Sequence, residues 1–209
     1  MITDRRRLGP DAEDRLAGRV AAAARAGVHL VQIRERDLDG GPFLRLVAGC
    51  VDAVRGTRAR ILVNDRVDVA LAAGAHGVHL RADSVAASRV RRIVPPGFLI
   101  GRSVHSVTEA VRAAADGGAD YLMFGTVFST TSKPDHAAAG ATALAEVVVA
   151  TSLPVLAVGG VTVATAPDAA GAGAAGIAAI ALFAHGSDQD LHAAVSAVVK
   201  AFDTPTGVP

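Results

Sequence analysis

Residues 99–125 read LIGRSVHSVTEAVRAAADGGADYLMFG, and this stretch decides the fold class. It begins with an apolar run, continues with an Ala-rich amphipathic segment, and ends with a second apolar run. Gly117-Gly118-Ala119 separates the amphipathic segment from the second run, as glycine does at a helix C-cap. A strand, a helix and a second strand in this order predict a parallel βαβ unit.

The same alternation extends outward in both directions along the chain. The apolar runs predict strands at Val28–Ile33, Ile61–Val63, Gly77–Leu80, Leu99–Ser103, Tyr121–Gly125, Val155–Val158 and Gly176–Ile180. The amphipathic stretches predict helices at Glu13–Ala26, Phe43–Val54, Val67–Ala73, Val85–Val94, Val107–Ala115, Ala143–Ala150 and Leu191–Phe202. Alternating strands and helices predict an α/β protein with a parallel sheet.

A repeat of about 25 residues per unit is typical of a (β/α)8 TIM barrel, and 209 residues suffice for one. The eighth strand would be Met1–Thr3, which is short. The alternative is a doubly wound open sheet, although no Gly-x-Gly-x-x-Gly follows the first strand. We expect a single-domain barrel over residues 1–202 and a frayed tail over residues 203–209.

Composition excludes several classes of protein. A hydrophobic share of 51% excludes disorder, because so apolar a chain can bury a large core. A net charge of +1 gives no basic excess for nucleic acid or an anionic membrane. The one cysteine excludes an internal disulfide and multi-cysteine metal sites, and we expect Cys50 to be a buried core thiol.

The N-terminal residues carry charges without an apolar segment behind them, and no run of eighteen uncharged apolar residues occurs. We therefore expect a cytoplasmic enzyme with a small-molecule ligand, without nucleic-acid or membrane partners. The sequence leaves the oligomeric state open, a homodimer included.

In such barrels the chemistry lies where strands end, and the predicted strands end in polar residues. Gln32 and Arg34 would point into the barrel, where Arg34 would bind an anion. An internal ion pair of Arg34 with Glu35 or Asp65 is the alternative. Asn64 could bind a ligand or, with Asp65, cap the following helix.

The residues at two further strand ends indicate a proton-transfer group and a phosphate site. Ser106 and Glu109 have capping-box spacing, which puts His105 just before a helix as a candidate acid–base residue or as a structural histidine. Gly159 and Gly160 would offer backbone N–H groups to a phosphate, completed by the turn at Ile180 and Ala181, or they would only form a tight turn.

Lys133 lies in a Ser- and Thr-rich loop over residues 129–140, which could order over an anionic ligand or be a solvated linker. Arg36 and Ser103 come from the same strand ends as Arg34 and His105. The predicted substrate-binding set is Gln32, Arg34, Arg36, Asn64, Ser103 and Lys133.

Several of these segments, in order along the chain, resemble the thiamine phosphate synthase superfamily. They are residues 31–36 (VQIRER), 63–70 (VNDRVDVA), 77–80 (GVHL), 101–106 (GRSVHS), 118–121 (GADY), 124–128 (FGTVF) and 158–161 (VGGV). The resemblance implies a (β/α)8 barrel that handles thiazole phosphate in vitamin B1 synthesis.

The resemblance implies one of two activities. The synthase joins hydroxymethylpyrimidine diphosphate to thiazole phosphate with Mg2+, held by an aspartate corresponding to Asp65 and by an acid at the position of Ser84. Ser84 replaces that acid, with Asp83 one residue away, and Arg36 replaces a lysine. These departures weaken the synthase interpretation.

The second activity, thiazole tautomerase, needs no metal and aromatises a carboxylated thiazole phosphate by a proton shift that one histidine can perform. The runs IRER at residues 33–36 and GRSVHS at residues 101–106 resemble this branch more closely. We therefore predict a tautomerase with His105 as the catalytic residue and without a metal or cofactor. The synthase with Mg2+ at Asp65 is the alternative, and a non-catalytic phosphate-binding regulator is the third hypothesis.

Overall fold

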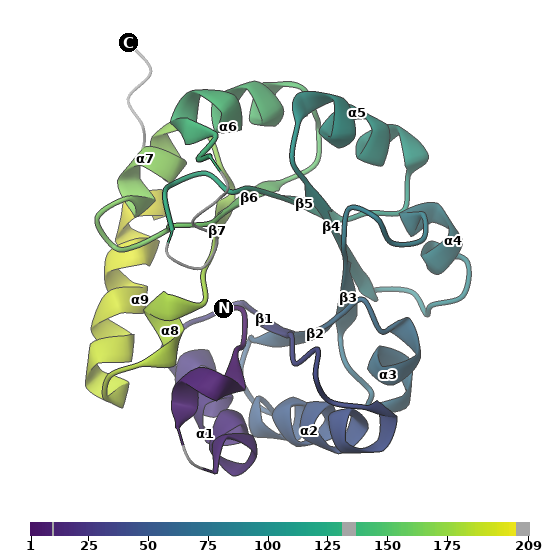
Figure 1. The fold of residues 1–209 in the computed structure, drawn as a ribbon, viewed down its shortest axis with the longest axis vertical. Coiled ribbons are helices and arrows are strands. Elements are labelled where there is room, and N and C mark those ends of the chain that lie inside the picture. The colour runs from purple at the N-terminus through teal and green to yellow at the C-terminus, as the bar shows by residue number, and fades with distance from the viewer. Residues whose placement is uncertain (10, 131–136, 204–209) are drawn as a thin grey trace. The chain divides into compact units, whose positions relative to one another are not determined.

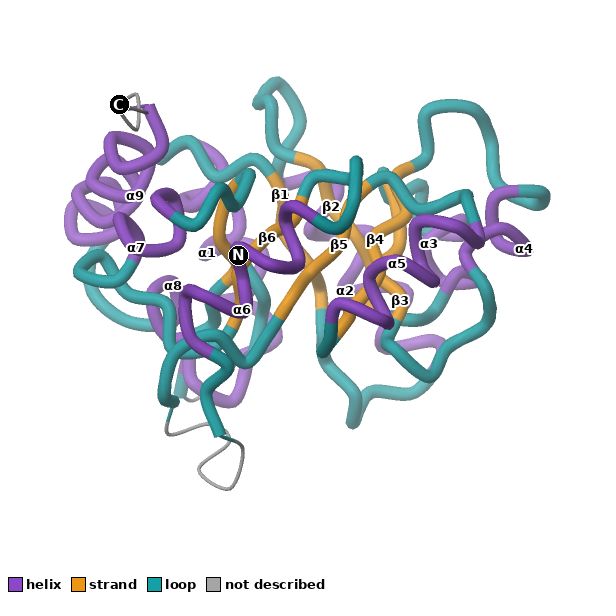
Figure 2. Tube along the Cα trace, turned by 90° about the horizontal axis from the view of Figure 1, so that it is seen from above, coloured by secondary structure: helices purple, strands orange, loops and turns teal. Residues whose placement is uncertain are grey.

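The computed structural model describes residues 1–9, 11–130 and 137–203. The chain divides into two compact units. The first unit contains Met1–His79, Val94–Leu99 and Ile180–Ser196, and the second contains Leu80–Ile93, Ile100–Ala179 and the chain from Ala197. The alternation of strand and helix along the chain can be followed by colour in Figure 2.

The first unit contains parallel strands in the order β1 (Leu30–Ile33), β2 (Arg60–Asn64) and β3 (Gly77–Leu80). Its helical elements are η1 (Arg5–Leu8), α1 (Ala12–Arg25), α2 (Gly40–Ala53), α3 (Val67–Ala72), α8 (Ala181–Ala184) and the first part of α9 (Asp188–Asp203). α1 and α2 lie side by side and cover one face of β1 and β2 (Figure 1). Every residue of β3 is buried, as expected of a parallel strand covered on both faces.

Met1–Thr3, the predicted eighth strand, lies beside β1. The Gln32 N–H donates to the Met1 carbonyl at 2.9 Å, and the Thr3 N–H donates to the Gln32 carbonyl at 2.9 Å. The pairing amounts to an isolated parallel bridge between Ile2 and Gln32 rather than a regular strand. This segment is therefore as short as its sequence indicates, and it fixes the backbone on both sides of Gln32.

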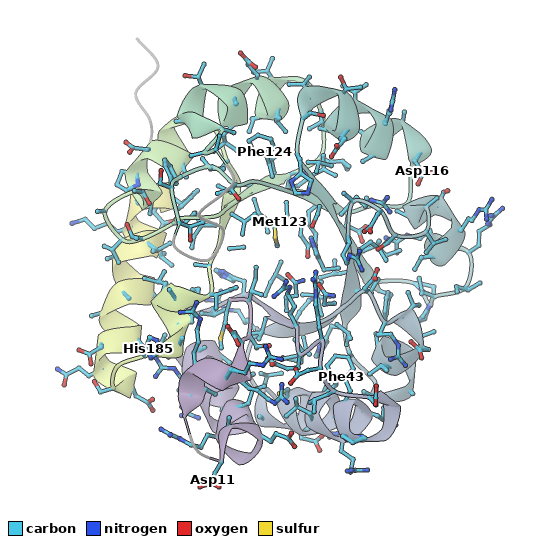
Figure 3. The ribbon with its side chains drawn as sticks, viewed as in Figure 1. Asp11, Phe43, Asp116, Met123, Phe124 and His185 are labelled. Atoms are coloured by element: carbon cyan, nitrogen blue, oxygen red, sulfur yellow. The ribbon has the colours of Figure 1, made fainter. Side chains whose placement is uncertain are left out.

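The second unit contains parallel strands in the order β4 (Leu99–Val104), β5 (Tyr121–Phe124), β6 (Val155–Val158) and β7 (Gly176–Ala178). Its helices are α4 (Ala87–Arg91), α5 (Val107–Asp116), α6 (Gly140–Val149) and α7 (Ala166–Gly171). The side chains of Met123 and Phe124 point to opposite faces of β5 (Figure 3), as successive residues of a strand must. Phe124 packs into a core with Leu144 and Val147 of α6.

The predicted elements occur in the predicted order, with shifted ends. The helix expected over Val85–Val94 is shorter, because α4 ends at Arg91 and Val94 precedes Pro95, where helical backbone is disfavoured. The strand expected over Gly176–Ile180 ends at Ala178, since Ile180 is already the N-cap of α8.

Cys50 is a fully buried residue of α2, as predicted. Burial raises the pKa of its thiol to about 12, so the thiolate form that a nucleophile requires is scarce at neutral pH. Among the described residues, no helix is both long and apolar enough to cross a membrane.

Candidate active site

Gln32 and Asn64 are predicted site residues that the structure joins directly. The Gln32 Nε2 donates to the Asn64 Oδ1 at 2.9 Å, from the neighbouring strands β1 and β2. Gln32 is 5% exposed, and its Oε1 is buried with no hydrogen-bond partner within the described part of the chain. Because buried polar atoms normally form hydrogen bonds, this oxygen is available to accept one from a bound ligand.

The capping alternative for Asn64 and Asp65 is wrong. The N-cap of α3 is Arg66, and no side chain caps this helix. Asp65 has a left-handed backbone, with φ of 64°, and its N–H donates to the His79 carbonyl at 2.9 Å. Aspartate tolerates this conformation better than most residues, which explains why an Asn-Asp pair can end β2 with such a turn.

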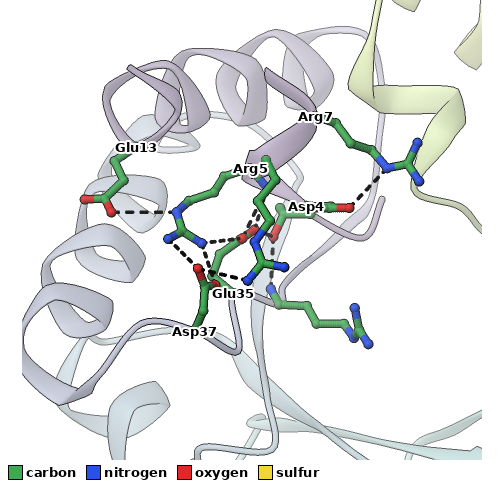
Figure 4. A network of polar contacts seen from close by, with 9 residues as sticks. Asp4, Arg5, Arg7, Glu13, Glu35 and Asp37 are labelled. Atoms are coloured by element: carbon green, nitrogen blue, oxygen red, sulfur yellow. Dashed lines mark hydrogen bonds and ion pairs between the residues drawn. The ribbon is translucent and has the colours of Figure 1, made fainter. Parts of the chain in front are cut away.

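Arg34 and Arg36 lie in the segment after β1, called here the β1 loop (residues 34–37). Arg34 is half-buried and Arg36 is exposed. The Arg34 N–H donates to the Thr3 Oγ1 at 2.9 Å. Glu35, one of the two predicted partners of Arg34, accepts a hydrogen bond from the Thr3 hydroxyl. It also accepts hydrogen bonds from Arg5 (Figure 4).

His105 immediately precedes α5, as predicted. Ser106 is the N-cap, and its Oγ accepts the Glu109 N–H at 3.1 Å. The Glu109 carboxylate accepts from the His105 N–H at 2.8 Å, one residue earlier than in a standard capping box. These contacts fix the backbone of His105.

The His105 ring is oriented by the Gly125 carbonyl, which lies 2.6 Å from Nδ1. A carbonyl oxygen can only accept a hydrogen bond, so we assign the proton to Nδ1. Nε2 then holds the lone pair of the neutral imidazole. His105 is also exposed, so a ligand can reach Nε2 and transfer a proton to its lone pair.

Ser103 lies on β4 and is partly buried. With Arg102, Glu109 and Arg112 it lines a cavity of about 300 Å³ in the second unit. Sequence reasoning missed this cavity and did not identify Arg102 as a site residue. The Arg102 guanidinium donates to the carbonyls of residues 82, 84 and 85 at 2.7, 3.2 and 2.7 Å, in the segment called here the β3 loop (residues 81–85).

Gly159 and Gly160 are required by backbone geometry. Their φ angles are 94° and 63°, a region that favours glycine. A Cβ on Gly160 would lie 2.4 Å from the carbonyl oxygens of Phe128 and Ser129. The tight-turn alternative therefore accounts for both glycines without a ligand, and phosphate binding here stays a prediction.

The remaining predicted site residues lie elsewhere. Ile180 and Ala181 form the N-terminus of α8, which is four residues long, and they belong to the first unit, whereas Gly159 and Gly160 belong to the second. The structure thus describes the two halves of the predicted phosphate site separately. Lys133 lies outside the described residues.

Comparison with known proteins assigns the family. Residues 1–183 match a family described as thiamine monophosphate synthase. The chain belongs to this family. The match covers the segments that hold Gln32, Asn64, His105 and the glycine pair.

Relatives within the family are named for the synthase. A thiamine-phosphate synthase from Methanoculleus marisnigri is 47% identical over 70% of this chain and 69% of its own. One from Roseiflexus castenholzii is 43% identical over 79% of this chain and 72% of its own. A solved structure titled thiamine phosphate pyrophosphorylase from Pyrococcus furiosus has a TM-score of 0.82 and 31% identity, covering 99% of this chain and 95% of that one.

These comparisons correct the predicted activity. The expectation of a thiazole tautomerase, an isomerase, is wrong, because the relatives at 47% and 43% identity carry the synthase name. The chain has the α/β fold of the Pyrococcus furiosus protein and is an enzyme of the thiamine-phosphate synthase type.

Proposed function

We propose that this protein is a thiamine-phosphate synthase, a transferase that joins hydroxymethylpyrimidine diphosphate to thiazole phosphate. The bond between the pyrimidine methylene carbon and the diphosphate oxygen breaks. A bond between that carbon and the thiazole nitrogen forms, and diphosphate leaves. The synthase names of relatives at 47% and 43% identity support this reaction.

The observation that carries the proposal is the buried Oε1 of Gln32, which has no donor within the described residues. Leaving a buried acceptor unpaired costs about 1–3 kcal/mol, which a ligand with a suitably placed donor recovers. The amino group of an aminopyrimidine is such a donor. Asn64 holds the Gln32 amide in the orientation that keeps Oε1 available.

The other predicted site residues take roles that suit these substrates. Arg34 and Arg36 would bind the diphosphate, since guanidinium groups are suited to phosphate oxygens. The predicted contact of Lys133 falls outside the described residues and stays a prediction. Ser103 would contact the substrate, and His105 would accept or donate a proton through Nε2. The backbone N–H groups of Gly159 and Gly160 would bind the thiazole phosphate. The other part of the predicted phosphate site, Ile180 and Ala181, belongs to the first unit and stays a prediction.

The fold proposal is a single (β/α)8 barrel over residues 1–202. It is supported by the alternation of strands and helices in both units and by the parallel bridge that Ile2 makes with Gln32. The one cysteine and the net charge of +1 support a cytoplasmic enzyme that acts on small molecules.

The family resemblance implies Mg2+ on two carboxylates, and the residues present do not fit that donor set. Asp65 is retained, but Ser84 stands at the second position, and its Oγ accepts the Arg81 N–H at 3.0 Å. The nearby Asp83 carboxylate is paired with the Arg81 guanidinium. No cluster of three or more metal-ligating side chains occurs among the described residues.

The test mixes the protein with hydroxymethylpyrimidine diphosphate, thiazole phosphate and Mg2+, and measures thiamine phosphate as its fluorescent oxidation product. We expect thiamine phosphate and diphosphate to appear in equal amounts. Gln32→Ala should raise the KM for the pyrimidine diphosphate, because it removes the unpaired acceptor. Absence of product from the wild-type protein would contradict the proposal, and pyrophosphate binding without turnover would favour a non-catalytic regulator.

A further inference from the structure

Met1–Thr3 contacts strand β1 at Gln32, one of the predicted site residues. Backbone hydrogen bonds of 2.9 Å join Gln32 N to the Met1 carbonyl and Thr3 N to the Gln32 carbonyl. Both peptide groups of Gln32 are therefore fixed by Met1–Thr3. The side chain that carries the unpaired acceptor is consequently held by its neighbour on β2 and by this segment.

The Thr3 hydroxyl links Arg34 and Glu35, the first two residues of the β1 loop. It accepts the Arg34 N–H at 2.9 Å and donates to the Glu35 Oε1 at 2.6 Å. Thr3 is 1% exposed and Glu35 is 4% exposed, so water does not compete well for either contact. A single buried hydroxyl thus fixes the direction in which the chain leaves β1.

Arg5 anchors the Glu35 carboxylate. The Arg5 N–H lies 3.1 Å from each Glu35 oxygen, and the Arg5 Nη1 lies 3.3 Å from Oε2 (Figure 4). The same guanidinium forms two hydrogen bonds with Asp37, at 2.6 and 2.8 Å. Both ends of the β1 loop are therefore attached to Thr3 and Arg5.

We propose that Thr3 and Glu35 are positioning residues for the substrate-binding residues Gln32 and Arg34. The inference rests on the proposed function, because Gln32 and Arg34 bind the diphosphate substrate only in that proposal. Thr3 bonds to the backbone of Gln32 and Arg34, and Glu35 acts on them through the Thr3 hydroxyl. Displacement of a binding group by about 1 Å can weaken its interactions with substrate severely.

The experiment compares Thr3→Val with Thr3→Ser and with a matched control, Thr57→Val. Thr57 has the same pattern of contacts in a loop before β2, since its Oγ1 accepts the Ala59 N–H at 3.1 Å and donates to the Val54 carbonyl at 2.7 Å. Each valine variant loses a hydroxyl that accepts one hydrogen bond from a backbone N–H and donates another. Only Thr3→Val affects the segment attached to the proposed site.

Two measurements follow the substrate site: the Kd for inorganic pyrophosphate by calorimetry, and the KM and kcat for the pyrimidine diphosphate. We expect Thr3→Val to raise Kd and KM about five- to tenfold, with kcat changed less, because one hydrogen bond that orders the site is lost. Thr3→Ser should stay within about twofold of wild type, since the hydroxyl is retained. Thr57→Val should also stay within about twofold, although its melting temperature falls.

The outcomes separate the two proposals. If Thr3→Val and Thr57→Val change Kd and KM equally, Thr3 is only a structural residue and the positioning role is wrong, while the synthase function stands. If the wild-type protein neither turns over nor binds pyrophosphate, both proposals fail. Should Thr3→Val not fold, Thr3→Ala provides the same comparison, and an unchanged KM in that variant would overturn the inference.

Discussion

The β1 loop is held by carboxylates, whereas the β3 loop is held through its own backbone carbonyls. In the first, the buried Glu35 and the partly exposed Asp37 accept hydrogen bonds from Arg5. In the second, Arg102 donates to three carbonyl oxygens of an exposed segment. The Arg5 contacts are with carboxylates, which titrate, and the Arg102 contacts are with carbonyls, which do not, so these two sets of contacts should respond differently to acid. They should also respond differently to loss of one partner, because a buried group left unpaired costs more than one that water reaches.

The largest effect should come from Glu35→Gln. The new amide has one acceptor oxygen where Glu35 has two, so its NH2 group faces either the Thr3 hydroxyl or the Arg5 guanidinium and leaves that donor unpaired. Breaking a buried charge pair on one side costs about 3 kcal/mol in the free energy of unfolding. Urea denaturation measures this loss.

Asp37→Asn is the control for this change, because Asp37 is 37% exposed whereas Glu35 is 2% exposed at the side chain. It should cost less than about 1 kcal/mol. An equal loss in both variants would show that burial does not distinguish the two carboxylates, and the comparison between the loops would lose its basis.

Arg102→Met should have a smaller effect on stability, about 1 kcal/mol, because water can replace the guanidinium at the exposed carbonyls. The main effect of Arg102→Met should be faster hydrogen exchange than in wild type at the backbone amides of residues 82–86, measured by mass spectrometry. Arg112→Met, on the wall of the same cavity, should leave that exchange unchanged. Unchanged exchange in Arg102→Met would mean that other contacts hold the β3 loop.

The smallest effect concerns pH. Hydrogen bonds from Arg5 hold the pKa of Asp37 well below its ordinary value of 3.8. Because the folded-state pKa is depressed, the stabilisation is fully present above the unfolded-state pKa and is lost as pH falls through the folded-state value. The stability difference between wild type and Asp37→Asn should therefore shrink below about pH 4.

Urea titrations at several pH values between 7 and 2 measure this difference. Arg102→Met serves as the internal comparison, since its lost partners are carbonyl oxygens that do not titrate. A difference for Asp37→Asn that stays constant in acid would contradict the assignment of its depressed pKa to Arg5.

Local patterns predicted the elements and several contacts correctly. Apolar runs and C-cap glycines located the strands and helices, and the spacing of Ser106 and Glu109 predicted the start of α5. Such features depend on residues a few positions apart, which is the range that a sequence pattern reports.

Long-range contacts could not be predicted in this way. Thr3 and Glu35 are 32 positions apart, and Arg102 lies 17 to 20 positions from its carbonyl partners. An arginine that binds carbonyl oxygens leaves no signature in the sequence, since every residue has a carbonyl group. The tautomerase prediction depended on single substitutions such as Ser84, and the synthase names of relatives at 47% and 43% identity overturned it.

The buried thiol of Cys50 makes the protein its own reporter of local opening. It is the one cysteine in the chain and lies fully buried on α2 of the first unit, the unit that contains the β1 loop. A thiol reagent can modify it only after that unit opens, so the labelling rate measures opening directly. Glu35→Gln should therefore accelerate labelling of the native cysteine, with no dye or engineered probe, whereas Arg102→Met should leave the rate nearly unchanged.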